Sequence, residues 1–219
     1  MAPRARGRGM PATLGLLLLS GMALAACSTV GVRQAEEPPF TVAARIGAVE
    51  VRQYGQRIAA ETVVQGDEEA SRSTGFRRLA GYIFGANHGG VKIAMTAPVA
   101  QEAAGAPIAM TAPVAQTRDA DGNWRIRFFM PASYTMATLP RPDDPAVSLV
   151  PVPPETLAVL RFSGTPSAAS VAARTGELVA ALEGSAWRPA GAPLAWFYDP
   201  PWTLPPLRRN EVAIPVSPK

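Results

Sequence analysis

Ile93–Gln101 has the sequence IAMTAPVAQ, and the same nine residues return fifteen positions later as Ile108–Gln116. Each copy predicts an apolar strand that stops at Pro98 or Pro113, because proline lacks the N–H that a strand ladder needs. The residues before the first copy, Phe76–His88, predict the end of a helix followed by a Gly/Asn turn. The centre of the chain is therefore predicted to run helix, turn, strand, loop, strand.

A methionine stands at the same place in each copy, as Met95 and Met110. Methionine packs well into irregular gaps, so both residues are candidates for a barrel core. The alternative is that they contact a bound ligand, since small-molecule pockets are lined mainly by apolar side chains. The repeat alone leaves both interpretations open.

The composition suits a folded protein without a nucleic-acid partner. The 219 residues are 47% hydrophobic, which is enough for a real core in one large domain or two small ones. The formal net charge is +4, but three of the basic residues are Arg4, Arg6 and Arg8 near the N-terminus. Beyond Ala26 the chain carries 18 basic against 17 acidic residues, so nucleic-acid binding is not expected.

The first 26 residues have the pattern of a secretory signal peptide. The three arginines form a basic n-region, and Leu14–Leu19 with Gly21–Ala26 form an apolar h-region. The apolar stretch is too short for a stable membrane span. Residues 1–26 are therefore predicted to be a signal peptide that is removed from the mature protein.

The signal ends in Leu24–Ser28, LAACS, which resembles the bacterial lipobox, whose cysteine receives a diacylglyceryl group. Cys27 is the only cysteine of the chain, so no disulfide forms within it, and lipidation leaves no thiol for catalysis. The alternative is ordinary cleavage at Ala23–Ala25, an A-x-A site. We expect a lipoprotein, in which several acyl chains contribute about 0.8 kcal/mol per buried CH₂ to a stable membrane anchor.

The residue after Cys27 is Ser28 and not an aspartate, and in this the sequence resembles lipoproteins that are sent to the outer membrane. The expected location is the cell envelope, with the chain lipid-anchored in the outer membrane and facing the periplasm. Thr29–Pro39 is polar and ends in two prolines, so residues 27–47 are predicted to be a tether. Residues 48–217 are predicted to be one folded domain, because no flexible linker divides them.

The first half of this domain predicts a hairpin and a helix. Val49–Tyr54 and Arg57–Val64 are extended runs separated by Gly55 and Gln56, which is typical of a hairpin. Asp67 is the predicted N-cap of the helix. The residues predicted to share its buried face are Phe76, Leu79, Ala80, Ile83 and Phe84, and those predicted to face solvent are Arg72, Arg77 and Arg78.

The second half repeats the pattern. Thr165 and Pro166 are the predicted N-cap and first residue of a second helix, and Gly184 is its predicted C-cap. The inward stripe of this helix is Val171, Thr175, Leu178 and Leu182. Trp124–Met130 is the last predicted strand of the first half. The predicted strands of the second half are Val147–Val152, Leu157–Phe162, Leu194–Tyr198 and Glu211–Val216.

Two rounds of strand-strand-helix-strand-strand predict a duplicated α+β unit. The strands should form one curved antiparallel sheet or open barrel, and both helices should pack on it.

Few residues have the chemistry that catalysis needs. The chain has a single histidine, His88, and one histidine and one lipidated cysteine cannot build a zinc or iron site by themselves. No glycine-rich loop leads from a strand into a helix in the phosphate-binding pattern. The carboxylate pairs Glu68-Glu69 and Asp143-Asp144 stand at a predicted helix start and turn. The sequence favours binding over enzymatic activity. His88 itself is either a solvated loop residue or an axial ligand of a haem iron.

Two features near the C-terminus have open interpretations. Arg208–Val212, RRNEV, is either an anion or partner site, or a turn whose side chains satisfy backbone groups at the end of the barrel. Trp196, Tyr198 and Trp202 stand among prolines, where they either cover the barrel end or form a stacking platform.

Several segments together resemble the SOUL haem-binding protein family, and the match runs from about Ala48 to Val216. The segments that carry the resemblance are Val49–Tyr54 (VEVRQY), Leu79–Phe84, Lys92–Val99 (KIAMTAPV), Phe129–Pro131, Leu139–Pro142, Arg161–Gly164, Tyr198–Trp202 and Arg208–Val212. The resemblance implies a distorted β-barrel that carries two helices. It also implies binding of haem or another tetrapyrrole in a shallow hydrophobic cleft beside the first helix.

In one animal branch of this family the haem-ligating histidine falls at the position of Gln53, which is a poor iron ligand. Other relatives bind porphyrin through apolar contacts and basic residues. The resemblance then suggests Phe76, Leu79 and Ile83 as the apolar wall, with Arg72, Arg77 or Lys92 at the rim. The remaining candidates for ligand contact are His88, as the metal ligand, with Met95 and Met110.

These observations predict a monomeric envelope lipoprotein that binds haem or a porphyrin as a carrier or buffer. The competing prediction is a module that binds another small effector molecule, or an envelope interaction protein.

Overall fold

The centre of the molecule is a single curved sheet. The computed structural model describes residues 35–103, 123–200 and 202–219, and in this part ten strands form one antiparallel sheet. Their order is β1-β2-β7-β10-β9-β4-β5-β3-β6, with β8 beside β10. The strands are β1 (Phe40–Ile46), β2 (Val49–Tyr54), β3 (Arg57–Gln65), β4 (Val99–Ala103), β5 (Asn123–Phe129), β6 (Ser148–Val152), β7 (Glu155–Phe162), β8 (Trp187–Pro189), β9 (Leu194–Phe197) and β10 (Asn210–Pro218).

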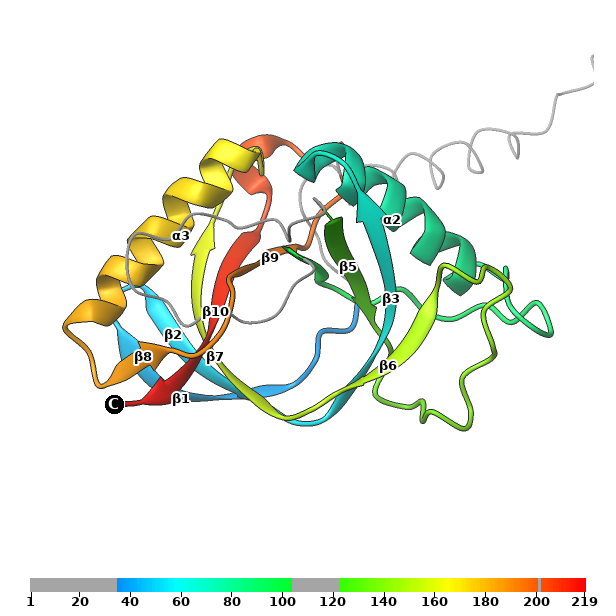
Figure 1. The fold of residues 1–219 in the computed structure, drawn as a ribbon, viewed down its shortest axis with the longest axis horizontal. Helices are drawn as coiled ribbons and strands as arrows, with labels where there is room; N and C mark the ends of the chain where they lie inside the picture. The colour runs from blue at the N-terminus through cyan, green and yellow to red at the C-terminus, as the bar shows by residue number, and fades with distance from the viewer. Residues whose placement is uncertain (1–34, 104–122, 201) are drawn as a thin grey trace, which may run out of the picture.

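The two long helices, α2 (Glu68–Ile83) and α3 (Ala168–Glu183), lie on the same side of the sheet. Figure 1 shows the sheet bent into a bowl, with α3 along its upper left flank and α2 along its upper right flank. The sheet does not close completely, so the shape is that of a distorted barrel. The predicted α+β class is confirmed.

The hairpin predicted between β2 and β3 is wrong. These strands do not pair with each other, because β2 pairs with β7, and β3 pairs with β6 and β5. A tight hairpin turn needs positive φ angles, and Gly55 does not have one. Instead, β2 and β3 form one bent ribbon through Gly55 and Gln56. A second bent ribbon, β6 and β7, lies antiparallel beside it, with Val49 opposite Leu160 and Arg57 opposite Val152.

The predicted duplication is confirmed by the strand pairing. The first unit is β2-β3-α2-β4-β5, and the second is β6-β7-α3-β9-β10, with β8 added after α3. The pairs β3·β5 and β4·β5 of the first unit correspond to β7·β10 and β9·β10 of the second. The units meet through β4 and β9 and through the two bent ribbons. The sheet therefore has an approximate twofold arrangement of its elements.

Local capping sets the start of each helix. Asp67 accepts hydrogen bonds from the N–H groups of Glu69 and Ala70 at 3.1 and 2.9 Å, which confirms the predicted N-cap of α2. The second helix begins two residues later than predicted, because the hydroxyl of Ser167, not Thr165, accepts from the N–H of Ser170. Gly184 ends α3 as predicted.

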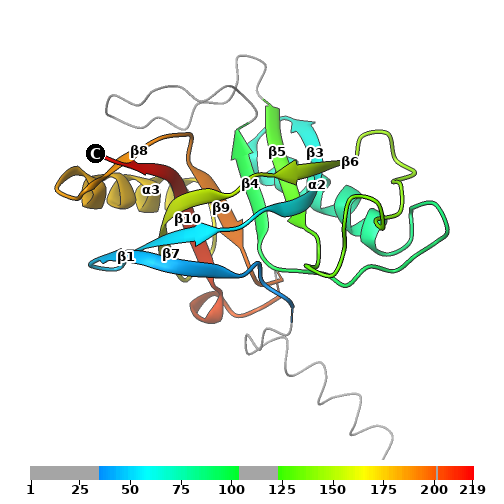
Figure 2. The ribbon, with the colours of Figure 1, turned by 90° about the horizontal axis from the view of Figure 1, so that it is seen from below.

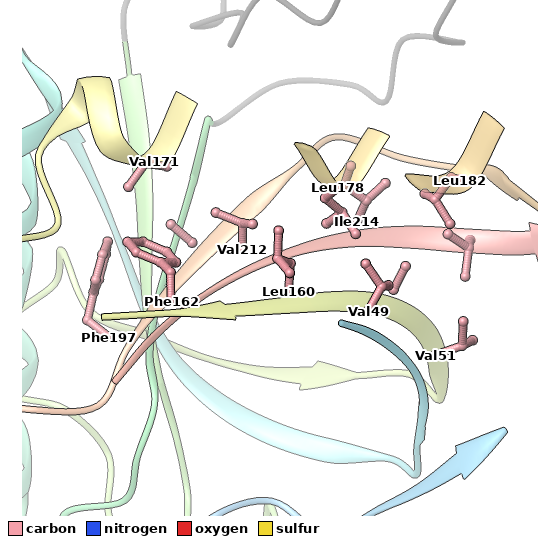
Figure 3. Packing of buried hydrophobic residues seen from close by; sticks show 13 residues of the cluster. Val49, Val51, Leu160, Phe162, Val171, Leu178, Leu182, Phe197, Val212 and Ile214 are labelled. Atoms are coloured by element: carbon pink, nitrogen blue, oxygen red, sulfur yellow. The ribbon is translucent and has the colours of Figure 1, made fainter. Parts of the chain in front are cut away.

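Helix α3 attaches to the sheet by the predicted stripe. Val171, Leu178 and Leu182 point down onto β7 and β10, as Figure 3 shows. Helix α2 packs in the same way on the alternating face of β5 that carries Trp124, Ile126 and Phe128. A third cluster, around Phe129, Leu157 and Trp196, fills the opposite, inner face of the sheet. Each helix thus covers half of the outer face.

The buried face of α2 differs from the prediction at both ends. Leu79, Ala80 and Ile83 are buried as expected, but Phe76 and Phe84 are exposed. Phe84 is the C-cap, so it lies beyond the regular helical face. Arg72 does not face solvent freely. Its guanidinium lies 4.2 Å from the centre of the Phe197 ring and donates to the carbonyl of Pro166.

The first copy of the repeated phrase is not a strand up to Pro98. It runs as an irregular segment in which the N–H of Ile93 donates to Ile83 and that of Ala97 donates to Glu36. Strand β4 begins only at Val99, immediately after the proline. The backbone groups of the irregular segment bond to a helix end and to the N-terminal segment instead of a sheet. The second copy, Ile108–Gln116, lies outside the described residues.

The fold begins earlier than the predicted boundary at residue 48. Strand β1, within the predicted tether, pairs with β2 from Phe40 opposite Tyr54 to Ile46 opposite Val49. It is an edge strand with many exposed residues, so its sequence lacks the apolar alternation of an inner strand. Within the described residues, no helix is long and apolar enough to cross a membrane.

The close contact between α2 and β5 makes a testable prediction at Gly75. A Cβ at this position would lie 2.8 Å from Ile126 side-chain atoms, whereas one at Gly81 in the same helix would meet its nearest atom at 4.0 Å. We expect Gly75→Ala to lower the free energy of unfolding by about 1–3 kcal/mol through overpacking. Gly81→Ala should raise it by up to about 1 kcal/mol through helix propensity.

Urea denaturation of both variants measures the two free energies. An equal gain in stability from both substitutions would show that α2 does not lie as close to β5 as described.

Candidate functional site

The predicted apolar wall beside α2 is part of the core. Leu79 and Ile83 are buried with Phe128 between the helix and the sheet. Phe76 is exposed and contacts the edge of Phe128, with ring centres 5.3 Å apart. Leu79 and Ile83 hold α2 on the sheet, so neither presents a surface to a ligand in this conformation. Their role in binding stays a prediction.

His88 lies at the surface in the turn after α2. Its Nδ1 is 3.3 Å from the Asp143 carboxylate and 3.3 Å from the carbonyl oxygen of Arg141. The buried side chain of Asn87 fixes this turn by donating to the carbonyls of Tyr82 and Val91. The Nδ1 edge of the imidazole is therefore already directed toward Asp143 and Arg141.

The other predicted contacts are scattered. Lys92 is exposed, Met95 packs at the edge of the α2 cluster, and Met110 lies outside the described residues. Among the three cavities considered below, which are formed by described residues, none is lined by Phe76, His88 or Lys92.

The largest of these cavities, of about 360 Å³, lies where β5 ends and β3 begins. Three of the segments that carry the family resemblance reach it, because β2 leads into it, Thr96 lines it, and Met130 follows β5. The N-terminal segment before β1 forms another wall. The lining residues are Glu36, Pro38, Pro39, Gly55, Gln56, Arg57, Ile58, Thr96, Met130, Pro131, Ala132, Tyr134, Thr135 and Met136.

Arg57 is the unusual residue of this cavity. It is only 9% exposed, and its guanidinium lies between the rings of Tyr54 and Phe129, 4.5 and 4.6 Å from their centres. Its Nη2 forms an ion pair with Glu155. Its Nε and Nη1 have no hydrogen-bond partner among the described residues. Leaving a buried donor unsatisfied costs about 1–3 kcal/mol, and more for a charged group.

Burial lowers the pKa of Arg57, and the charge of Glu155 opposes this effect. A further negative charge beside Arg57 would therefore stabilise its charged form. A guanidinium offers a planar set of donors that matches a carboxylate. The cavity combines this cation with apolar surface from Ile58, Met130 and Pro131, and its volume is within the usual range of about 300–1,000 Å³ for small-molecule pockets.

Two other cavities are less suited to a ligand. One of about 280 Å³ is lined by Phe129 and Trp196 on the inner face, but its arginines, Arg125 and Arg127, are already paired with Glu61 and Glu102. The other, between α2 and α3, measures only about 30 Å³, which is room for about one water molecule.

The RRNEV segment belongs to a buried ion network. The carboxylate of Glu211 is fully buried and accepts from Arg52 at 2.9 and 3.3 Å, from Arg209 at 2.8 and 3.0 Å and from the Tyr198 hydroxyl at 2.6 Å. Arg209 also pairs with Glu37 at 2.8 Å. All these groups are satisfied by one another, which favours a structural role for this segment over an anion site.

The pKa shifts of the network agree with this role. Burial alone would lower the pKa of Arg52, but the Glu211 carboxylate raises it above its ordinary value. Burial and the charge of Glu211 raise the pKa of Tyr198 far above its ordinary value. Arg52 thus stays charged and Tyr198 stays protonated across the physiological range. Among the described residues, no group of three or more His, Cys, Asp or Glu side chains could hold a metal ion.

Comparison with known proteins gives one family. The model described as "SOUL heme-binding protein" matches residues 35–215. No curated protein matches the sequence.

Solved structures share the fold at low identity. The chain is similar to the C-terminal domain of EcmrR, with a TM-score of 0.55 and 12% identity over 78% of this chain and 98% of that one. EcmrR in a complex with DNA gives a TM-score of 0.56 and 11% identity, over 78% of this chain and 57% of the other. An uncharacterized conserved protein from Listeria innocua gives 0.53 and 14%, over 77% and 92%. Such identities show the fold alone.

The buried network predicts a large effect of one substitution. Glu211→Gln keeps the shape of the side chain but leaves Arg52 and Arg209 without their shared charge, so we expect a loss of about 3–5 kcal/mol in unfolding free energy. The matched control is Glu177→Gln, which removes an exposed pair with Arg174 and should cost about 0–1 kcal/mol. Denaturant titration measures both. Equal costs for the two variants would show that Glu211 is not a central charge of the fold.

Proposed function

Because the chain belongs to the SOUL heme-binding protein family, we propose that it binds haem or another tetrapyrrole beside Arg57 and acts as a carrier or buffer of that ligand. The observation that supports this proposal most is the buried guanidinium of Arg57, which has two donors without a partner among the described residues and belongs to a residue that lines a largely apolar cavity. A tetrapyrrole with propionates has a flat apolar ring and carboxylates at one edge. The cavity offers complementary groups for both parts.

The lining residues divide this work between them. Met130, Pro131 and Ile58 supply apolar surface, and Arg57 binds a carboxylate with the donors that Glu155 does not use. Stacking between Tyr54 and Phe129 holds the guanidinium in place before a ligand arrives. A bound haem would supply an iron that accepts thioether or phenolate ligands, and Met130, Met136 and Tyr134 carry such groups. The family is one of binding proteins, and we propose no catalytic step.

A related candidate is a carrier of a metal-free tetrapyrrole or of another apolar carboxylate. The described lining of the cavity contains no histidine, which is the commonest protein ligand of haem iron in carriers. The recognition by Arg57 would be the same, since it depends on the carboxylate and not on the metal.

The cellular setting is also a proposal. The lipobox-like LAACS sequence at Leu24–Ser28 supports lipidation of Cys27, and Ser28 supports the outer membrane as destination. We propose that the folded domain faces the periplasm as a monomer on a short tether. In that position it would take up or release its ligand at the membrane surface.

A haemin titration of residues 27–219, followed by absorbance, tests the binding proposal. We expect a saturable Soret shift. The affinity for haemin should fall about 10- to 100-fold in Arg57→Met, because a hydrogen bond to a charged group contributes about 1.5–3 kcal/mol. The matched ligand is the dimethyl ester of haemin, which should bind both proteins equally. Metal-free protoporphyrin, monitored by fluorescence, separates iron ligation from recognition of the ring.

Equal haemin affinity of Arg57→Met and the unchanged protein would overturn the assignment of the site. No saturable response to either tetrapyrrole would overturn the tetrapyrrole proposal itself. His88→Ala tests the remaining prediction of an axial ligand. We expect an unchanged Soret spectrum, because His88 does not line the cavity; a lost shift would make this histidine the iron ligand.

Lipidation is tested by the mass of the protein after expression with its own leader in a Gram-negative host. We expect a chain that begins at Cys27 and carries the added mass of its acyl groups, and that partitions into detergent. Cys27→Ser should remove this added mass. A protein cleaved after Ala25, without acyl groups, would contradict the proposal.

A further inference from the structure

The loop between β9 and β10 exposes a concentrated set of apolar side chains. Trp202 is 64% exposed, Leu204 is 56% exposed and Leu207 is 43% exposed, and these three lie within six residues. Pro205 and Pro206 between them are exposed as well. A cluster of this kind on a soluble domain marks a surface that meets a protein or a membrane. We refer to Trp202–Leu207 as the apolar loop.

The apolar loop is fixed to the domain in this outward position. Thr203 is buried, and its carbonyl accepts from Nε of Arg208 at 2.7 Å. The carbonyl of Pro205 accepts from the N–H of Gly164 at 2.9 Å, which ties the loop to the segment before α3. The short 3₁₀ helix η1 (Pro205–Leu207) adds a bond from Leu207 to Leu204. These bonds hold the backbone, so the exposed side chains cannot turn inward together.

The N-terminal segment enters the domain at the base of this loop. Glu37 forms an ion pair with Arg209 at 2.8 Å, and the N–H of Arg209 donates to Asp199 at 2.6 Å across the base of the loop. Figure 2 shows the start of β1, in blue, and the red-orange loop before β10 at the same lower edge of the molecule. The N-terminal segment therefore contacts the domain at Arg209, at the base of the apolar loop.

The length of this segment limits how far the loop can be from an anchored Cys27. Glu37 is ten positions after Cys27, and at most about 3.3–3.6 Å per residue gives a reach of roughly 35 Å. Tryptophan prefers the boundary between headgroups and acyl chains, and leucine is at home below it. We propose that the apolar loop docks on the lipid bilayer that holds the anchor. This inference rests on the proposed lipidation of Cys27.

The test replaces natural lipidation by chemical coupling, so that it does not depend on it. Because Cys27 is the only cysteine, residues 27–219 can be coupled through it to a maleimide phospholipid. The vesicles contain phosphatidylethanolamine and phosphatidylglycerol with brominated acyl chains, which quench tryptophan fluorescence at close range. We expect quenching of the unchanged protein to exceed that of Trp202→Phe at least about twofold, since the other tryptophans are wholly or partly buried in the fold.

The matched control moves the tryptophan to another exposed site. Phe84, at the end of α2, is 63% exposed, so Trp202→Phe combined with Phe84→Trp keeps the number and exposure of tryptophans. This double variant should show no more quenching than Trp202→Phe alone. Equal quenching from positions 202 and 84, or none from Trp202, would overturn the docking proposal. Haemin binding and natural acylation are measured separately, so a failure of either one can be distinguished from a failure of the apolar loop to dock.

Discussion

The fold depends on one buried carboxylate, that of Glu211 on β10. In the sheet, β7 lies between β10 and β2, so the ion pair of Glu211 with Arg52 reaches across a whole strand. Neighbouring strands lie about 4.8 Å apart, and only a long side chain on a curved sheet can span two such steps. A buried charge is tolerated when it is paired and costly when it is not. The network therefore fixes the register and the curvature of three strands together, and Arg209 extends it to the N-terminal segment.

The same constraint positions the candidate ligand site. Arg52 and Arg57 belong to one ribbon, which bends at Gly55 and Gln56 between them. On one side of the bend the arginine is satisfied by Glu211. On the other side Arg57 has Glu155 and two aromatic rings but keeps two donors unused. The two buried arginines thus differ in their surroundings, because only Arg52 meets a full set of hydrogen-bond acceptors. The first stabilises the sheet, and the second is the residue that we propose to bind a ligand.

What the sequence could predict was decided by distance along the chain. The cap at Asp67, the stripe from Val171 to Leu182 and the duplicated order of elements are local patterns, and the structure confirms them. Glu211 and Arg52 are 159 residues apart, and nothing local distinguishes Arg57 from any charged residue at a strand start. The hairpin was mispredicted because Gly55 and Gln56 fit a turn as well as a bend, and only the long-range pairing with β6 and β7 decides between them. The family resemblance suggested Leu79 and Ile83 of α2 as part of a ligand-binding wall, but both are buried in the core between the helix and the sheet.

The N-terminal segment connects the two proposals physically. Glu36, Pro38 and Pro39 line the cavity beside Arg57, and Glu37 between them pairs with Arg209 at the base of the apolar loop. The residues that would lead to the lipid anchor are thus also a wall of the ligand site. With the apolar loop on the bilayer, this wall lies on the membrane side of the domain. A ligand with an apolar ring and a carboxylate would lie in the membrane with its carboxylate at the headgroups and its ring among the acyl chains. The cavity offers matching groups for both parts of such a ligand. A carrier built in this way would meet its ligand at the membrane and would need no soluble intermediate.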